Sequence, residues 1–240
     1  MNAPERLADP TVATKSVAIL QSNYVPWKGY FDLLASVDEF ILYDDVQYTT
    51  RDWRNRNLIK TPRGREWLSI PVGADRNRLI REVALPRDDW GAVHLAKLRE
   101  SYARAPFWSE VSALIAPHYA PRRFATLSAL NRALLEAVCA YLGITTVLRY
   151  AWEYPSAPGK TSRMVDLCRA AGATRYVSGP AAKDYLEVER FREHGIEVAW
   201  HSYDGYPAYP QLWGEFVHQV SILDLLFNCG RDATRYMLHA

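Results

Sequence analysis

The chain has 240 residues, of which 49% are hydrophobic and 23% are charged, and its formal net charge is +2. This size and composition are typical of a globular protein and argue against disorder over most of the chain. The near-neutral charge gives no global electrostatic reason to expect binding to nucleic acid or to a membrane surface. The 8 Trp and 15 Tyr are typical of cores and of sites that stack on flat or sugar-like ligands.

No motif in the sequence indicates a cofactor or a metal ion. The three cysteines have no CxxC spacing and the six histidines have no HxxH or HExxH spacing, so neither a disulfide framework nor a metal site is predicted. The first residues lack the apolar run of a signal peptide, and no stretch reaches the roughly 18 apolar residues of a membrane span. We therefore expect a cytoplasmic protein without a membrane span.

The first third of the chain predicts a β-loop-α-β unit. Residues 1–15 are small, polar and proline-containing, which indicates a disordered tail before a single α/β domain over 16–240. SVAILQ (16–21) predicts a strand, GYFDLLASV (29–37) a short helix, and EFILYDDV (39–46) a strand that ends in two acids. This order favours parallel pairing of the two strands.

The middle of the chain predicts a hairpin and three helices. WLSIPV (67–72) and LIREVALP (79–86) resemble two strands around a turn, at an edge of the sheet. A helix over 88–105 begins with an Asp cap, and two more follow over 106–120 and 124–143, the last closed by Gly143.

The second half alternates strands with helices. Strands are expected over 145–150, 174–179 and 196–203, and helices over 162–172, 181–195 and 220–230. This alternation predicts an α/β fold with a mostly parallel, Rossmann-like sheet flanked by helices on both faces.

Ligands of such sheets bind beyond the carboxyl ends of the strands. Residues 21–30, 44–48 and 178–183 follow three of these ends and carry unusual polar groups, so we expect them to converge on one rim. Two of these loops lead into a helix, where Gly29 and Gly179 would let an anion approach free backbone N–H groups. The alternative is that both are ordinary tight turns.

The segment 51–60, RDWRNRNLIK, combines four cations, two amides and an indole. Guanidinium groups suit phosphate or carboxylate, and Trp53 could stack on a ring. The alternative is an arginine-rich loop paired internally with acids such as Asp52.

Asp44 and Asp45 point to opposite faces if the strand continues through them. We therefore expect one to face the ligand, as a general base or as an indirect Mg²⁺ ligand, and the other to be structural. For Cys229, the sequence favours a structural position at the C-terminal cap of a helix over a role as a nucleophile.

Four segments together are similar to the WbqC-like family: residues 21–60, GATRYVSGPAAKDYL (172–186), YPQLWGEF (209–216) and SILDLLFNCG (221–230). The resemblance extends from Val17 to about Tyr236, and departs from the family pattern where Ser22 replaces a proline. It implies a place in bacterial gene clusters for O-antigen, the lipopolysaccharide polysaccharide, and related surface glycans. Some members are described as transferases of glycine or other acyl groups onto amino sugars.

The opening is also similar to the start of HIGH-type nucleotidyltransferase domains, in which paired histidines hold nucleotide phosphates. Trp27 and Tyr30 or their neighbours stand at those positions here, and neither can act as a histidine does. The loop 178–183 could still bind a phosphate, so a nucleotide-binding enzyme of this fold remains an alternative.

The resulting hypothesis is a transferase that moves an acyl or aminoacyl group onto an amine, with a nucleotide-sugar or a carrier-linked acyl group as substrate. Side chains that would orient the acceptor, stack on it, bind its phosphate or carboxylate, or accept the amine proton are Gln21, Asn23, Tyr24, Trp27, Tyr30, Asp44, Asp45, Arg51, Trp53, Arg54, Asn55, Lys60, Ser178 and Lys183. The main alternative is a non-catalytic adaptor that positions a carrier or a partner enzyme, with the segment 51–60 as its docking surface. Nucleic-acid binding ranks last.

Overall fold

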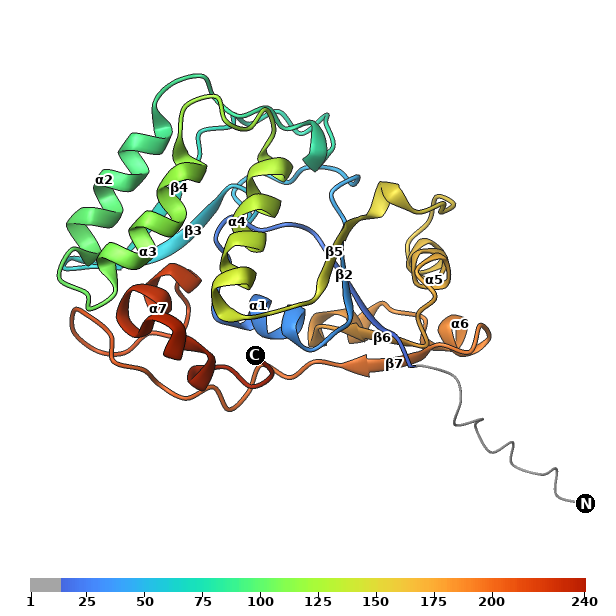
Figure 1. The fold of residues 1–240 in the computed structure, drawn as a ribbon. Helices are drawn as coiled ribbons and strands as arrows, with labels where there is room; N and C mark the ends of the chain where they lie inside the picture. Colours follow the sequence, from blue (N-terminus) through green and yellow to red (C-terminus); the bar gives the residue numbers. More distant parts are fainter. Residues whose placement is uncertain (1–13) are drawn as a thin grey trace, which may run out of the picture.

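A five-stranded parallel sheet forms the centre of the computed structural model, which describes residues 14–240 (Figure 1). The strand order is β5-β2-β1-β6-β7, with β1 (Ser16–Leu20), β2 (Glu39–Leu42), β5 (Val147–Tyr150), β6 (Arg175–Ser178) and β7 (Glu197–Trp200). The predicted α/β class and parallel sheet are confirmed. Most of the predicted tail lies outside the described residues, but Lys15 is held by Glu39 Oε2, which accepts from its Nζ at 2.8 Å.

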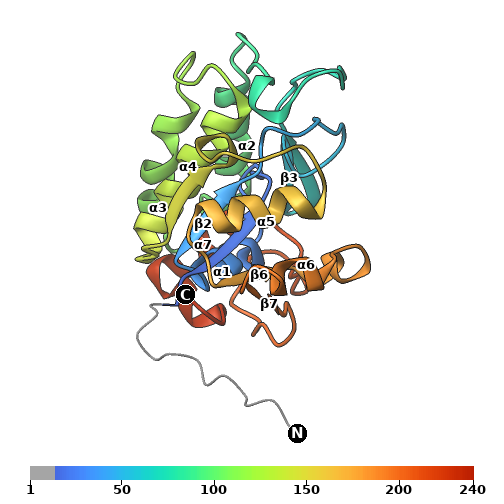
Figure 2. The ribbon, with the colours of Figure 1, turned by 90° about the vertical axis from the view of Figure 1, so that its right-hand side faces the viewer.

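Helices cover both faces of the sheet, which explains why β1 and β2 are apolar after their first residues, Ser16 and Glu39. One face packs against α1 (Lys28–Ala35), α4 (Leu127–Leu142) and α7 (Ile222–Cys229), and the other against α5 (Thr161–Ala170) and α6 (Val188–Arg192). Within β1, Ala18 faces the first core, while Val17 and Ile19 face the second. Figure 2 shows α5 and α6 in front of the sheet, and Figure 1 shows them on the opposite side of it from α3 and α7.

The antiparallel hairpin lies at a different place from the prediction. It joins β3 (Arg56–Thr61) to β4 (Gly64–Ser69) as a separate two-stranded sheet, and the segment 79–86 holds the short 3₁₀ helix η1 (Ile80–Glu82) and isolated bridges from Leu79 and Ala84. The charges of residues 51–60 concealed β3, although Asn57 and Ile59 alternate with half-buried neighbours as a strand requires. Gly64, at φ 106°, forms the turn that no other residue would adopt without strain.

Of the remaining α-helices, α2 (Trp90–Tyr102) packs against the hairpin and α3 (Trp108–Ile115) against α4. The 3₁₀ helices are η2 (Ala116–Tyr119), η3 (Ala151–Glu153), η4 (Pro180–Asp184) and η5 (Gly230–Tyr236). Asp89 caps α2, and Gly143 closes α4 at φ 77°, both as predicted. The helix expected over 181–195 is divided into η4 and α6. Among the described residues, no helix combines the length and apolarity needed to cross a bilayer.

Candidate functional site

A cavity of about 530 Å³ lies beyond the carboxyl ends of β1 and β7, where parallel sheets commonly bind ligands. Its wall combines the loop after β1, the loop after β7, the start of the hairpin and the segment before α7. The lining residues are Asn23, Pro26, Trp27, Trp53, Asn57, Tyr203, Asp204, Gly205, Tyr206, His218 and Gln219. We call this space the rim cavity.

One side of the rim cavity is an aromatic wall. The Trp27 ring lies 5.3 Å from the Tyr203 ring and 5.7 Å from the Tyr206 ring, measured between centroids. Gly29 permits this arrangement, because a Cβ there would lie 2.3 Å from Cζ2 of Trp27. The loop after β6 packs against Tyr203 at Gly179, where a Cβ would lie 3.3 Å from the Tyr203 hydroxyl. The wall therefore offers flat apolar surface for a ring to stack on.

The hairpin holds the loop after β1 from the other side. The Asn57 side-chain amide donates to the backbone oxygens of Tyr24 at 3.2 Å and Val25 at 3.1 Å. Val25 has a φ of 36°, an uncommon value for a β-branched residue, and these bonds help to hold it there. The loop that carries Asn23 and Trp27 is thus fixed in place before any ligand arrives.

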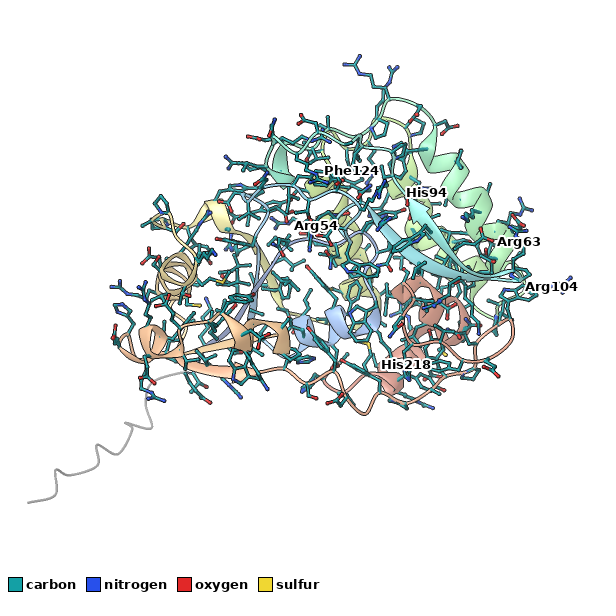
Figure 3. The ribbon with its side chains drawn as sticks, turned by 180° about the vertical axis from the view of Figure 1, so that it is seen from behind. Arg54, Arg63, His94, Arg104, Phe124 and His218 are labelled. Atoms are coloured by element: carbon teal, nitrogen blue, oxygen red, sulfur yellow. The ribbon has the colours of Figure 1, made fainter. Side chains whose placement is uncertain are left out.

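Arg54 is a buried clamp for this loop and does not line the rim cavity. Its Nη1 donates to the backbone oxygens of Gln21 and Ser22, each at 3.3 Å, and to Oδ1 of Asn23. Asp52 lies 3.7 Å from Nη2. Figure 3 shows Arg54 near the middle of the molecule, which fits a role in shaping the loop.

Asp44 and Asp45 both lie in the loop after β2, because that strand ends at Leu42, earlier than predicted. Asp44 is fully buried and accepts hydrogen bonds from Ser22 N–H at 2.7 Å and from Ser128 Oγ of α4 at 2.5 Å. Burial raises the pKa of Asp44. Asp45 forms an ion pair with Arg163. Each carboxylate thus has a partner within the protein, and neither lines the rim cavity.

The two predicted tyrosines are buried. The Tyr24 hydroxyl lies 2.8 Å from Nδ1 of His94 and 2.7 Å from the Tyr119 hydroxyl. The Tyr30 hydroxyl donates to the backbone oxygen of Gln21 at 3.1 Å. Both therefore hold the framework beneath the loop after β1.

The remaining predicted residues are distributed around the molecule. Arg51 is exposed and, with Asn55, lines a different cavity of about 590 Å³. Lys60 is buried, and its Nζ donates to Oε1 of Gln211 at 2.8 Å. Ser178 is buried at the end of β6, and Lys183 lies 5.7 Å from the centroid of Trp200. Of the predicted side chains, Asn23, Trp27 and Trp53 meet in the rim cavity.

The model of the WbqC-like protein family matches residues 21–236. The chain belongs to this family. It is also 51% identical over 225 residues to "Uncharacterized protein Rv1507c" of Mycobacterium tuberculosis, a match that covers 93% of this chain and 97% of that protein. No solved structure gave a match.

Sequence reasoning missed much of the site of this WbqC-like chain. The rule that ligands bind beyond strand ends applies to β7 as well, and would have led to the aromatic loop of Tyr203 and Tyr206. His218 and Gln219 had no comparable signal, because they follow no strand and reach the rim cavity only through the path of the chain before α7. Figure 3 shows His218 beside α7, away from Arg54.

His218 has the electrostatics of a proton acceptor. It is exposed at the rim cavity. Two effects lower its pKa below the usual value of 6.5: the larger is the loss of part of its hydration, and the smaller is the positive charge of Lys28. The imidazole is therefore neutral near pH 7 and can accept a proton. With Asp204 and the amides of Asn23 and Gln219, it gives the rim cavity polar groups opposite in character to the aromatic wall.

Proposed function

We propose that the rim cavity binds an amino sugar and that the protein transfers an acyl or aminoacyl group, such as glycyl, onto its amine during bacterial surface-glycan synthesis. The observation that carries this proposal is the combination of an aromatic wall with amide and carboxylate groups in one cavity. Sugars present apolar ring faces to indole and phenol rings, and their hydroxyls pair with amides and carboxylates. Family membership supports the glycan setting.

The size of the rim cavity fits this class of ligand. Small-molecule sites commonly enclose roughly 300–1,000 Å³, and a volume of about 530 Å³ accommodates a sugar ring and the reactive end of a donor. Most of a nucleotide or a carrier would then extend outside. The acceptor would lie on Trp27, with hydroxyls toward Asn23 and Asp204.

His218 is the best-placed general base for the transfer. The amine of the acceptor attacks the carbonyl carbon of an activated acyl donor, a thioester or an ester. A C–N bond forms, the C–S or C–O bond breaks, and the proton lost by the amine passes through His218 to the leaving thiolate or alkoxide. Asp44 and Asp45 are less suited to this role, because both are engaged by protein partners away from the cavity.

Calorimetric titration with a panel of nucleotide-linked amino sugars tests the binding step. We expect saturable binding of at least one, weakened at least about tenfold by Trp27→Ala because a stacking contact is worth on the order of 1 kcal/mol or more. Trp152→Ala is the matched control, since Trp152 is a partly exposed indole outside the rim cavity. Equal affinity in both variants, or no binding by the wild type, would refute the proposal.

A role as an adaptor is supported by an exposed aromatic surface that adjoins the rim cavity, since Trp53 belongs to both. Trp53 and Trp67 are 44% and 40% exposed with their centroids 5.6 Å apart, and the Arg56 guanidinium lies 4.0 Å from the Trp67 ring. Exposed Trp and Arg are the residue types that dominate protein interfaces. If Trp67→Ala abolishes glycan modification in cells while sugar binding and in vitro transfer stay intact, this surface serves a partner protein.

A further inference from the structure

Three potential metal ligands meet behind the aromatic wall, from distant parts of the chain. Asp32 lies in the middle of α1, His201 directly follows β7, and His239 is the penultimate residue. One donor atom from each of the three lies within 4.8 Å of the others. Their separation in sequence explains why histidine spacing gave no sign of them.

The distances suit a single small cation. Oδ2 of Asp32 lies 2.9 Å from Nδ1 of His239 and 3.5 Å from Nε2 of His201. In a tetrahedral zinc site with metal–ligand bonds of about 2.0–2.1 Å, neighbouring ligand atoms are about 3.3–3.4 Å apart. The Asp32 oxygen is therefore within about 0.5 Å of such a spacing from each histidine nitrogen, whereas the two histidine nitrogens, which lie within 4.8 Å of one another, would have to approach by up to about 1.5 Å.

His201 provides an independent indication of a missing ligand. The residue is only 4% exposed, and its Nε2, which faces Asp32, has no hydrogen-bond partner among residues 14–240. Buried polar atoms are nearly always paired, so an unpaired imidazole nitrogen beside a carboxylate calls for a specific explanation. A metal ion is the ligand that such a nitrogen commonly binds.

The carboxylate is already oriented for this purpose. Oδ1 of Asp32 accepts hydrogen bonds from the backbone N–H groups of Leu238 at 2.8 Å and His239 at 2.6 Å, while the Tyr206 hydroxyl donates to Oδ2 at 2.8 Å. Such outer partners fix the direction in which a ligating oxygen points. The His239 side chain is 44% exposed, which leaves a route for ion and water.

We propose that Asp32, His201 and His239 form a binding site for Zn²⁺ or a similar divalent transition metal, with water as the fourth ligand. Two imidazole nitrogens and one carboxylate oxygen are the donors that zinc and its neighbours prefer, whereas Mg²⁺ and Ca²⁺ favour oxygen alone. The site joins α1, the end of β7 and the C-terminal segment. It therefore acts as a structural clip and does not depend on the proposed transferase activity.

The clip supports the rim cavity from behind. Tyr206 donates to the ligating carboxylate and lines the cavity, and the His201 ring packs against Tyr203 with centroids 4.9 Å apart. A bound ion would hold these two tyrosines in position. Metal binding and the order of the aromatic wall are thus coupled.

The test uses the full, untagged chain after treatment with a chelator and dialysis. Zinc is titrated in competition with a chromophoric chelator, and Co²⁺ is added separately to record its visible absorption spectrum. We expect one zinc ion per chain, a rise in the melting temperature on adding zinc, and a Co²⁺ spectrum typical of four-coordinate nitrogen and oxygen ligands.

Variants decide whether these three residues bind the ion. His239→Ala removes an exposed side chain, so the fold should persist by circular dichroism while zinc affinity falls at least about tenfold. His201→Ala should do the same, and His194→Ala, at an exposed histidine after α6, should bind as the wild type. An absence of stoichiometric zinc binding, or binding unaffected by His239→Ala and His201→Ala, would overturn the proposal and leave the cluster as a hydrogen-bonded carboxylate–histidine pair.

Discussion

His94 should make the stability of this protein strongly dependent on pH. The residue is 5% exposed, belongs to α2 (Figure 3), and lies between the Tyr24 hydroxyl and the backbone oxygen of Ser69, which is 3.0 Å from Nε2. A carbonyl oxygen can only accept, so Nε2 carries the hydrogen and Nδ1 accepts from Tyr24. Burial lowers the pKa of His94 to about 4.

The sign and size follow from linkage. An unfolded histidine titrates near pH 6.5, so as the pH falls below this value the unfolded chain binds a proton that the folded chain refuses. The stability contributed by neutral His94 is complete above pH 6.5 and is lost progressively down to about pH 4. Because one unit of pKa shift corresponds to about 1.4 kcal/mol, the free energy of unfolding falls by about 2 kcal/mol at about pH 5 and by about 3 kcal/mol below pH 4.

Urea denaturation at about pH 7.5 and about pH 5 measures this effect. Other groups titrate over the same interval, so the relevant quantity is the difference between the wild type and His94→Gln. We expect the wild type to lose about 2 kcal/mol more than the variant between the two pH values, and His194→Gln, at an exposed histidine, to lose as much as the wild type. An equal loss in the wild type and in His94→Gln would refute the assigned burial of a neutral His94 beneath Tyr24.

Three further changes test the framework and the base. Asp44→Asn replaces the buried carboxylate that accepts hydrogen bonds from Ser22 N–H and Ser128 Oγ. It should lower the free energy of unfolding, measured by urea titration, by about 1–3 kcal/mol. An unchanged free energy of unfolding would mean that these hydrogen bonds do not form. Gly143→Ala should cost about 1 kcal/mol, and Gly143→Asn less, because φ is 77° while no atom obstructs a Cβ; equal stability of all three proteins would contradict the left-handed cap. The transfer rate should decline as the pH falls through the lowered pKa of His218, and His218→Gln should abolish this decline; a pH profile unaltered in that variant would assign the base elsewhere.

The parallel sheet was predictable because its pattern is local. The strands are short apolar runs that alternate with helices over much of the chain, and glycines mark helix ends, as Gly143 does after α4 and Gly172 after α5, so alternation alone indicates an α/β fold. The hairpin was misplaced because β3 carries Arg56 and Lys60, whose charges obscure the period of two. Lys60 is buried in spite of its charge, since Gln211 and the backbone oxygen of Glu215 accept from its Nζ, and these partners lie about 150 residues away in sequence.

The site was predictable only in part, and for a physical reason. Asn23 and Trp27 follow the central strand β1, so topology alone places them at the rim. The cations of residues 51–60 looked equally functional, but Arg54 satisfies the backbone oxygens of the loop after β1. Sequence cannot distinguish a guanidinium that binds a ligand from one that binds the backbone. The cluster of Asp32 and the two histidines depends wholly on three-dimensional proximity.

A crystal structure of the protein soaked with the tightest-binding nucleotide-linked amino sugar is the most direct test of the proposed function. We expect a sugar ring against Trp27, in the space bounded by Tyr203 and Asn23, with its amine within hydrogen-bonding reach of the His218 imidazole. Sugar density confined to the arginine-lined cavity around Arg51, or an amino group directed away from His218 into solvent, would contradict it.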